Sequence, residues 1–307
     1  MSLLEVKDLS VFFTKYISMF HKQDVIAMES LHLSVNEGEI VAVIGSSGSG
    51  KSLLAHAILG ILPDNAKTTG QIMYQGQLLD RKRLHALRGK EIVYVPQSVN
   101  YLDPLMKVGR QVHQSSKDQH VVQKQKDLFQ RYRLAEHVER LYPHQLSGGM
   151  LRRVLVASAA IKQPRLIVAD EPTPGMHPDD VKEALQNFRE LAAAGAGVIF
   201  ITHDIDSALK IADRVAVFYA GTTIEVANKE DFAGDGERLR HPYTKSLWNA
   251  LPQNEFQPIT GSQPKSSAEI VGCLFADRCN QMTSACLQER PELRTVRDGE
   301  VRCVHAS

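Results

Sequence analysis

Short runs of apolar residues, many of them β-branched, recur along the chain up to about residue 220. The runs lie at 39–45, 91–95, 165–169, 197–202 and 214–220, and they predict strands. Stretches of helical character lie between them, at 51–62, 151–162, 178–194 and 204–211. Continuous apolar runs suit strands that are buried on both faces, so the alternation predicts an α/β fold with a parallel sheet.

Two regions depart from this alternation. Residues 103–163 are mostly helical in pattern and polar at first, which predicts an inserted helical subdomain. Beyond residue 235, the segment 241–252 predicts a short helix with Tyr243, Leu247 and Leu251 on one face. Residues 253–269 are polar and contain Gly, Pro and Ser, and are typical of a linker. We therefore expect one domain over 1–235 and a C-terminal extension over 236–307.

The overall charge of the chain is close to balanced. Lys and Arg number 36 against 35 Asp and Glu, so the net charge is +1, which gives no support to a nucleic-acid binder with a strongly basic surface. The N-terminus lacks the pattern of a secretory signal, and the longest apolar runs, such as 154–161, are shorter than the roughly 18 residues that span a bilayer. We expect a soluble, cytoplasmic chain whose membrane role comes through a partner.

A glycine- and serine-rich loop, GSSGSGKS, follows the first predicted buried strand and precedes an apolar helix. In that position its backbone N–H groups point at phosphate oxygens, Lys51 reaches the β- and γ-phosphates, and the Ser52 hydroxyl binds Mg²⁺. The residues that we expect to bind the nucleotide here are Gly45, Ser46, Ser47, Gly48, Ser49, Gly50, Lys51, Ser52 and Leu53.

Three further predicted strands end in residues that suit ATP hydrolysis. Asp170 ends the apolar run of RLIVAD and would hold Mg²⁺ through water, and Glu171 would act as general base on the attacking water. Gln97 follows the strand EIVYV and would bridge Mg²⁺ and the helical insert. His203 follows GVIFIT and would contact the γ-phosphate and orient the water.

A second phosphate-binding element lies at LSGGMLRR, residues 146–153. Ser147, Gly148 and Gly149 open a helix with exposed N–H groups and a hydroxyl, which suits a γ-phosphate. One chain does not need two phosphate loops for one nucleotide. The sequence therefore predicts a dimer in which each chain closes over the ATP of the other.

In this order and spacing, the motifs of residues 1–235 resemble those of ATP-binding-cassette (ABC) ATPases. The resemblance implies a P-loop ABC ATPase fold with a RecA-like core sheet, an antiparallel β subdomain and the helical insert. It also implies that an aromatic residue, Phe13 or Tyr16, stacks on the adenine. The chain departs from the family pattern at Met150, at Arg152 where Gln is common, and at His177, where the family has an Asp that couples the two ATP sites.

Those departures leave one alternative open, an inactive regulatory cassette. The His177 position favours it, whereas the presence of Glu171 and His203 favours an active enzyme. Asp179 could take the place of the missing Asp if the loop shifts.

The C-terminal extension resembles, at HPYTKSLWNALP and in its cysteine pattern, that of ATPase subunits of bacterial oligopeptide, dipeptide and nickel importers. The resemblance implies an ATPase that powers import of peptides or a nickel-like metal complex from the cytoplasmic face of the inner membrane. Its implied partners are a second ABC ATPase subunit, two membrane permease subunits and, indirectly, an external solute-binding protein, with no nucleic acid. The alternative is a soluble ABC ATPase of nucleic-acid repair or translation.

All four cysteines of the chain, Cys273, Cys279, Cys286 and Cys303, lie within one short C-terminal window. Four thiolates can bind Zn²⁺ or a [4Fe–4S] cluster, and reduced structural thiols or adventitious disulfides are the remaining alternatives. The long spacings lack the close pairs of zinc modules, and the resembled family is described with a cluster, so we expect [4Fe–4S]. The expected role of the cluster is structural: it would stabilise a C-terminal extension that is too small and polar to fold alone. Redox or iron sensing is the alternative role.

Overall fold

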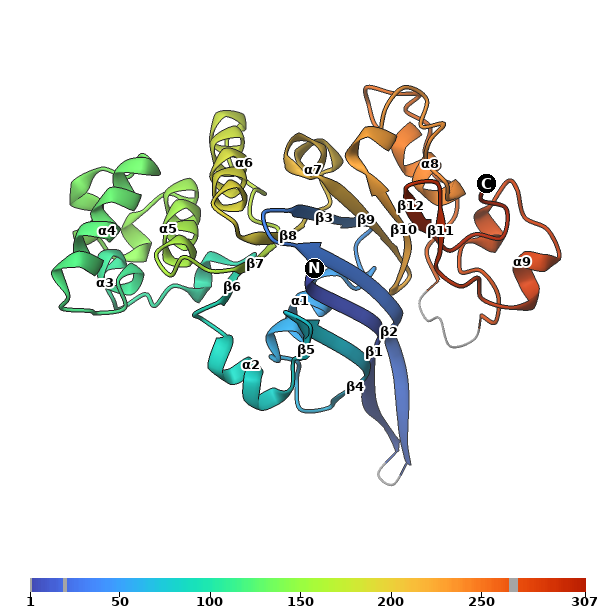
Figure 1. Ribbon diagram of the computed structural model, residues 1–307, viewed down its shortest axis with the longest axis horizontal. Coiled ribbons are helices and arrows are strands. Elements are labelled where there is room, and N and C mark those ends of the chain that lie inside the picture. The colour runs from blue at the N-terminus through green and yellow to red at the C-terminus, as the bar shows by residue number, and fades with distance from the viewer. Residues whose placement is uncertain (1, 19–20, 265–269) are drawn as a thin grey trace.

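The computed structural model describes residues 2–18, 21–264 and 270–307, and within these ranges the side chains of 16–18 and 21 lie outside the description. The described residues form two sheets, a group of helices at one end and a C-terminal extension at the other (Figure 1). The eight-stranded sheet lies between the two ends, and the four-stranded sheet lies beside it.

The eight-stranded sheet has five parallel strands at its centre, in the spatial order β6-β7-β8-β3-β9. They are β3 (Ile40–Gly45), β6 (Ile92–Val95), β7 (Leu166–Asp170), β8 (Gly197–Ile201) and β9 (Arg214–Tyr219). Nearly every residue in them is buried, as continuous apolar runs predict. The predicted parallel α/β core is therefore confirmed, with strand ends shifted by one residue at most sites.

Three antiparallel strands extend this sheet at the β9 edge, and the sequence patterns did not predict them. They are β10 (Thr222–Asn228), which pairs with β9, and β12 (Gly299–Val301) and β11 (Arg294–Val296) from the C-terminal extension. Because β12 pairs with β10, the extension adds its strands to the same sheet as the nucleotide-binding strands. At three residues each, β11 and β12 are too short for an apolar alternation to reveal.

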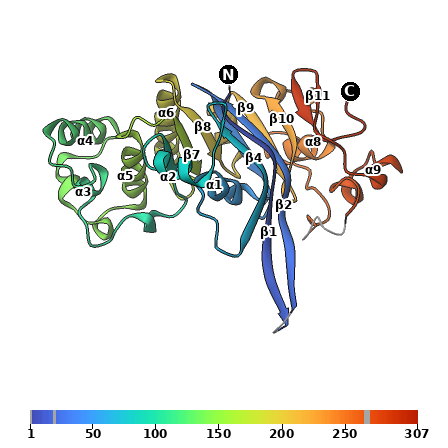
Figure 2. The same cartoon turned by 60° about the horizontal axis from the view of Figure 1, so that its bottom comes forward.

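The four-stranded sheet is antiparallel, with the order β2-β1-β4-β5. Its strands are β1 (Ser2–Ser18), β2 (His21–Asn36), β4 (Ala66–Tyr74) and β5 (Gln77–Leu78), and α2 (Arg81–Leu87) follows. Alternate apolar side chains of β1 and β2, such as Leu4, Leu31 and Leu33, pack in one core with the first helix, α1 (Lys51–Leu59). The β1–β2 hairpin extends well beyond the other strands (Figure 2).

The predicted helical insert consists of two helices of 13 residues each, α4 and α5, and four shorter ones. They are η1 (Val99–Tyr101), α3 (Val108–Val112), α4 (Gln119–Arg131), η2 (Glu136–Arg140), η3 (Pro143–Gln145) and α5 (Gly148–Ala160). Its apolar side chains share a core with α6 (Pro178–Ala193) and with strands β6, β7 and β8. The insert is thus packed onto the edge of the sheet from which Gln97 emerges.

Two predicted helix ends were wrong for local reasons. The helix predicted over 51–62 ends at Leu59, because Gly60 adopts a left-handed conformation with φ of 61° and caps it. The helix predicted over 151–162 begins at Gly148, because the Ser147 hydroxyl accepts a hydrogen bond from the Met150 amide, at 3.3 Å, and caps it. The helix predicted over 204–211 is α7 (Ile205–Ile211).

η4 (Lys229–Asp231) precedes the C-terminal extension, which contains α8 (Pro242–Asn249), η5 (Ala276–Arg278) and α9 (Ala285–Gln288). A buried ionic group fixes it to the sheet. Arg240 pairs with Asp231 at 2.9 Å and with Glu225 of β10 at 3.4 Å, and all three side chains are at most 1% exposed. The Arg240 Nε also donates to the Val296 carbonyl of β11, at 2.7 Å. Charges buried to this degree are stable only when paired in this way.

Candidate nucleotide-binding and hydrolysis site

The phosphate loop connects β3 to α1, and its backbone is already curved toward a ligand. Gly48 and Gly50 have φ of 78° and 97°, which only glycine adopts without strain. Gly45 permits a close approach, because a Cβ there would lie 2.3 Å from the Phe218 carbonyl oxygen. The Lys51 Nζ donates to the carbonyls of Gly45, at 2.8 Å, and Ser46, at 3.0 Å. Burial lowers the pKa of Lys51, against the effect of the carboxylates of Glu171 and Asp170.

The predicted site residues from four separate motifs line one cavity of about 630 Å³. The lining residues are Ala27, Ser47, Gly48, Gly50, Lys51, Ser52, Leu53, Gln97, Glu171 and His203. The parallel arrangement of β3, β6, β7 and β8 explains this convergence, because the carboxyl ends of parallel strands meet at one edge. Sequence reasoning missed Ala27 of β2, which carries no chemical group that a motif could reveal.

Glu171 and His203 are in direct contact within this cavity. The His203 Nδ1 lies 2.8 Å from the Glu171 Oε1, and the Thr202 hydroxyl donates to the Glu171 Oε2 at 3.4 Å. The Glu171 side chain is 8% exposed, whereas that of His203 is 66% exposed. Glu171 has a φ of 46°, a left-handed conformation that is strained for a residue with a Cβ. Strain of this kind is common where a side chain must point in one direction for chemistry.

Asp170 and Ser52 are suitable ligands for Mg²⁺. The Asp170 carboxylate is buried, its Oδ2 accepts from the Tyr94 hydroxyl at 3.3 Å, and its Oδ1 has no hydrogen-bond partner within the described residues. The Ser52 hydroxyl faces this carboxylate, and burial raises the pKa of Asp170. A buried oxygen left without a partner is costly, and a hard cation that takes oxygen ligands would satisfy it.

Ser147, Gly148 and Gly149 lie at the N-terminus of α5 and are not among the residues that line the cavity. Ser147 and Gly148 are exposed, and a Cβ at Gly148 would meet no atom within 4 Å. The structure therefore does not bring these residues to the phosphate loop of the same chain. Their role in the ATP site of a second chain stays a prediction.

Arg152, which the sequence marked only as a departure from the family pattern, connects three parts of the site. Its guanidinium donates to the carbonyl oxygens of Gln97, at 3.3 Å, Glu171, at 3.2 Å, and Pro172, at 3.3 Å. The side chain thus joins α5 of the helical insert to the loop after β6 and to the loop after β7. Burial lowers the pKa of Arg152, against the effect of Glu171.

The two aromatic candidates for stacking on adenine remain predictions. Phe13 packs against the core shared by the two sheets and is not among the residues that line the cavity. The side chain of Tyr16 lies outside the described residues.

The four cysteines lie together, as their clustering in the sequence suggested. All four, with His305, line one small cavity of about 10 Å³, and none forms a disulfide. The Cys273 amide donates to the Cys286 carbonyl at 2.8 Å, and the Cys286 Sγ lies 3.4 Å from the His305 Nε2. Burial raises the pKa of the Cys273 thiol to about 11, with a further contribution from the other three cysteines. Within the described residues, no three His, Cys, Asp or Glu side chains are placed as ligands of one metal ion.

Comparisons with known proteins agree with these motifs. Residues 28–174 match the family model described as ABC transporter, and residues 224–286 match that described as oligopeptide/dipeptide transporter, C-terminal region. The oligopeptide transport ATP-binding protein AppD of Bacillus subtilis is 31% identical, over 98% of this chain and 96% of its own length. The dipeptide transport ATP-binding protein DppD of Bacillus subtilis is 33% identical, over 92% and 88%.

Among solved structures, a dimeric bacterial ABC transporter cassette is similar, with a TM-score of 0.64 and 26% identity. The likeness covers 74% of this chain and 98% of that one. In the part of this chain that the structure describes, no helix is both long enough and apolar enough to cross a bilayer.

Proposed function

The chain belongs to the ABC transporter ATPases, in the branch with an oligopeptide/dipeptide-type C-terminal region, and we propose that its ATP hydrolysis powers peptide import across a bacterial membrane. The observation that carries the proposal is the cavity in which Lys51, Glu171 and His203 meet. The family match and the near full-length relatives support the same reaction. They do not favour the alternative of nucleic-acid repair or translation.

The residues of the cavity divide the reaction between them. The phosphate-loop amides and Lys51 bind and orient the phosphates, and the curved loop requires little rearrangement to do so. Asp170 and Ser52 would hold Mg²⁺, which supplies charge neutralisation at the β- and γ-phosphates. Glu171 takes a proton from the attacking water, and His203 fixes the direction of the Glu171 carboxylate.

The second half of the ATP site comes from another chain in this proposal. Ser147 and Gly148 are exposed at a helix N-terminus and, like Gly149, do not line the cavity of their own chain, so we propose that these three residues bind the ATP of a partner ATPase. The similarity to a dimeric cassette supports this arrangement. We further propose that the membrane subunits bind at the exposed Tyr101 and Leu105, a few residues after Gln97 in the sequence. The chain would then lie at the cytoplasmic face of the membrane.

Peptides are the cargo that we propose, because the relatives described above carry peptides in their printed names. Neither of these names mentions nickel, so import of a nickel complex has no support beyond the initial resemblance.

We also propose that the four cysteines bind a [4Fe–4S] cluster. Such a cluster would cross-link the segments of the C-terminal extension that carry them. Four thiols that line one cavity are the donor set that such a cluster takes. The cavity is small and the thiols do not converge on one point, so binding requires the side chains to turn toward a common centre.

The experiment that tests the main proposal is purification of the tagged chain from its native membranes, with the subunits that remain bound to it. We expect two membrane proteins to copurify, and ATP turnover to rise when a peptide-loaded binding protein is added. Copurification with nucleic acid that salt releases, and with no membrane protein, would contradict it.

A further inference from the structure

One residue of the segment that the sequence predicts as a linker contacts the phosphate loop. The Ser46 hydroxyl donates a hydrogen bond to the Gln263 Oε1, at 2.5 Å. Ser46 is the second residue of the loop, and its carbonyl is one of the two that hold the Lys51 Nζ. A residue of the C-terminal extension therefore contacts the part of the loop that positions the phosphate-binding lysine.

A second residue of the extension reaches the same serine. Tyr243, on α8, is buried, and its hydroxyl faces the side chain and backbone of Ser46. Its ring lies 4.5 Å, centroid to centroid, from that of Tyr219, at the end of β9. Because β9 pairs with β3, which leads into the phosphate loop, Tyr243 is packed against the strand pair that supports the loop.

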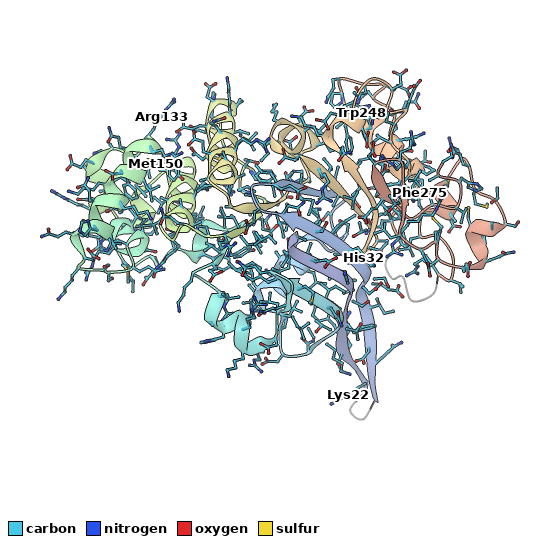
Figure 3. All side chains as sticks on the ribbon, viewed as in Figure 1. Lys22, His32, Arg133, Met150, Trp248 and Phe275 are labelled. Atoms are coloured by element: carbon cyan, nitrogen blue, oxygen red, sulfur yellow. The ribbon has the colours of Figure 1, made fainter. Side chains whose placement is uncertain are left out.

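Arg278 contacts both the segment that leads to Gln263 and the Tyr219 ring against which Tyr243 packs. Its guanidinium donates to the Thr260 carbonyl, at 2.7 Å, and to the Ile259 carbonyl, at 3.4 Å, and so fixes the segment that leads to Gln263. It also donates to the Tyr219 hydroxyl, at 3.0 Å, and lies over the Phe275 ring, 5.6 Å from its centroid. Figure 3 shows Phe275 where the extension meets the core sheet, far from Met150 in the helical insert.

Arg278 directly precedes Cys279, one of the four clustered cysteines. Two routes therefore lead from the cysteine cluster to Ser46. One passes from Arg278 through the segment 259–263 to Gln263, and the other passes through Tyr219 to Tyr243. Both routes end at Ser46, so a continuous set of contacts joins the extension to the phosphate loop.

We propose that Gln263, Tyr243 and Arg278 are positioning residues that hold the phosphate loop, through Ser46, in the conformation that binds nucleotide. A loop held in its bound conformation loses less entropy when the ligand binds, so the contacts raise nucleotide affinity without touching the nucleotide. The inference rests on ATP binding at this loop. It also assigns to the cysteine-rich extension an effect on the ATP site.

Titration of the full-length chain with a fluorescent ATP analogue and Mg²⁺ tests the proposal. We expect Gln263→Ala to weaken binding about three- to tenfold, the usual effect of one lost hydrogen bond. Tyr243→Phe, which removes the hydroxyl that faces Ser46, should change binding in the same direction. Gln253→Ala is the matched control for the first, because Gln253 is in the same linker but donates to Asp206, at 2.6 Å. Tyr74→Phe is the control for the second, because its hydroxyl donates to Glu91, at 3.1 Å. We expect both controls to bind as the unmodified chain does.

A double-mutant cycle shows whether the effect passes through Ser46. Addition of Gln263→Ala to a Ser46→Ala chain should weaken binding no further. Arg278→Lys, which keeps the charge but loses the fork of donors, should weaken binding less in a Gln263→Ala chain than in the unmodified one. A purely structural role would lower the melting temperature of the variants and leave their nucleotide affinity unchanged, and that result would overturn the proposal.

The outcomes separate this inference from the proposed function. If the unmodified chain binds the analogue and Lys51→Ala does not, the ATP site is present. Equal affinity of Gln263→Ala and the unmodified chain would then contradict the positioning role alone. If the unmodified chain does not bind the analogue at all, ATP binding itself fails, and the positioning role fails with it.

Discussion

The Nδ1 of His203 lies 2.8 Å from the Oε1 of Glu171, although the two residues come from the ends of different strands. His203 follows β8 and Glu171 follows β7, and these strands are paired in parallel, with Asp170 opposite Ile201. The Glu171 amide also donates to the Ile201 carbonyl, at 2.9 Å. The sheet therefore fixes the backbone of the general base, and the histidine fixes its side chain.

This contact predicts that His203→Ala lowers the rate of hydrolysis more than it lowers ATP affinity. Without the imidazole, the Glu171 carboxylate can rotate away from the attacking water. We expect ATP turnover of the assembled complex to fall about 100-fold, the lower range for loss of general-base function, with the dissociation constant of ATP nearly unchanged. Equal losses in affinity and turnover would contradict this interpretation.

Arg152 predicts a smaller effect of a different kind. Its three hydrogen bonds to carbonyl oxygens join the helical insert to the loops of Gln97 and Glu171. Arg152→Ala should lower ATP turnover of the complex about three- to tenfold, as expected for lost hydrogen bonds from a charged group. Arg133→Ala in the same insert is a control, because the Arg133 side chain is 77% exposed. An unchanged turnover of Arg152→Ala would show that the insert does not depend on this contact.

Asp213 predicts how stability depends on pH. Burial alone would raise the pKa of Asp213, but hydrogen bonds from Arg189, at 2.7 and 2.8 Å, and from the Ile40 amide, at 2.9 Å, lower it overall. A depressed folded-state pKa contributes stability above the unfolded-state value of about 3.9 and loses it as pH falls through the folded-state pKa. Asp213→Asn should therefore lower the free energy of unfolding by about 1 kcal/mol at pH 7, a partly exposed pair being screened by solvent.

Urea unfolding of both chains at several pH values measures this difference. The gap between Asp213→Asn and the unmodified chain should be constant from pH 5 to 8 and should narrow below about pH 4. A gap that widens as pH falls would contradict the assignment. Asp24→Asn is the comparison at the surface: its pair with Lys67 is more exposed to solvent screening, and we expect a smaller gap than for Asp213→Asn.

The cysteine cluster predicts a defined metal content. Protein purified without oxygen should contain about four iron and four acid-labile sulfide per chain, as a [4Fe–4S] cluster requires, and Cys279→Ser should lose both. Stoichiometric zinc would contradict the cluster, and would mean that the cysteines bind a structural zinc ion instead. Absence of metal from both proteins would leave the four thiols as reduced structural residues.

The parts of the site that could be predicted are those whose residues lie close together in the sequence or at the ends of regular strands. The phosphate loop was predictable because Gly45, Lys51 and Ser52 act within one short turn between a strand and a helix. The meeting of Glu171 and His203 followed from the parallel sheet, because both residues end buried strands.

Contacts that depend on irregular segments could not be predicted. Gln263 lies in a stretch without periodicity, so no pattern indicated that it reaches Ser46. His305 beside Cys286 was missed for the same reason, because one histidine near the end of a chain carries no motif. The partner site of Ser147 requires a second chain, and a single sequence does not contain the geometry of that contact.

The measurement that tests the central claim most directly is ATP turnover by the assembled complex with Glu171→Gln in this chain. The substitution keeps the shape of the side chain and removes its ability to accept a proton. We predict that ATP remains bound while turnover falls by at least about 100-fold, as for loss of a general base. Turnover that is nearly unchanged would contradict the account, and would mean that this chain is an inactive regulatory cassette rather than the ATPase of the importer.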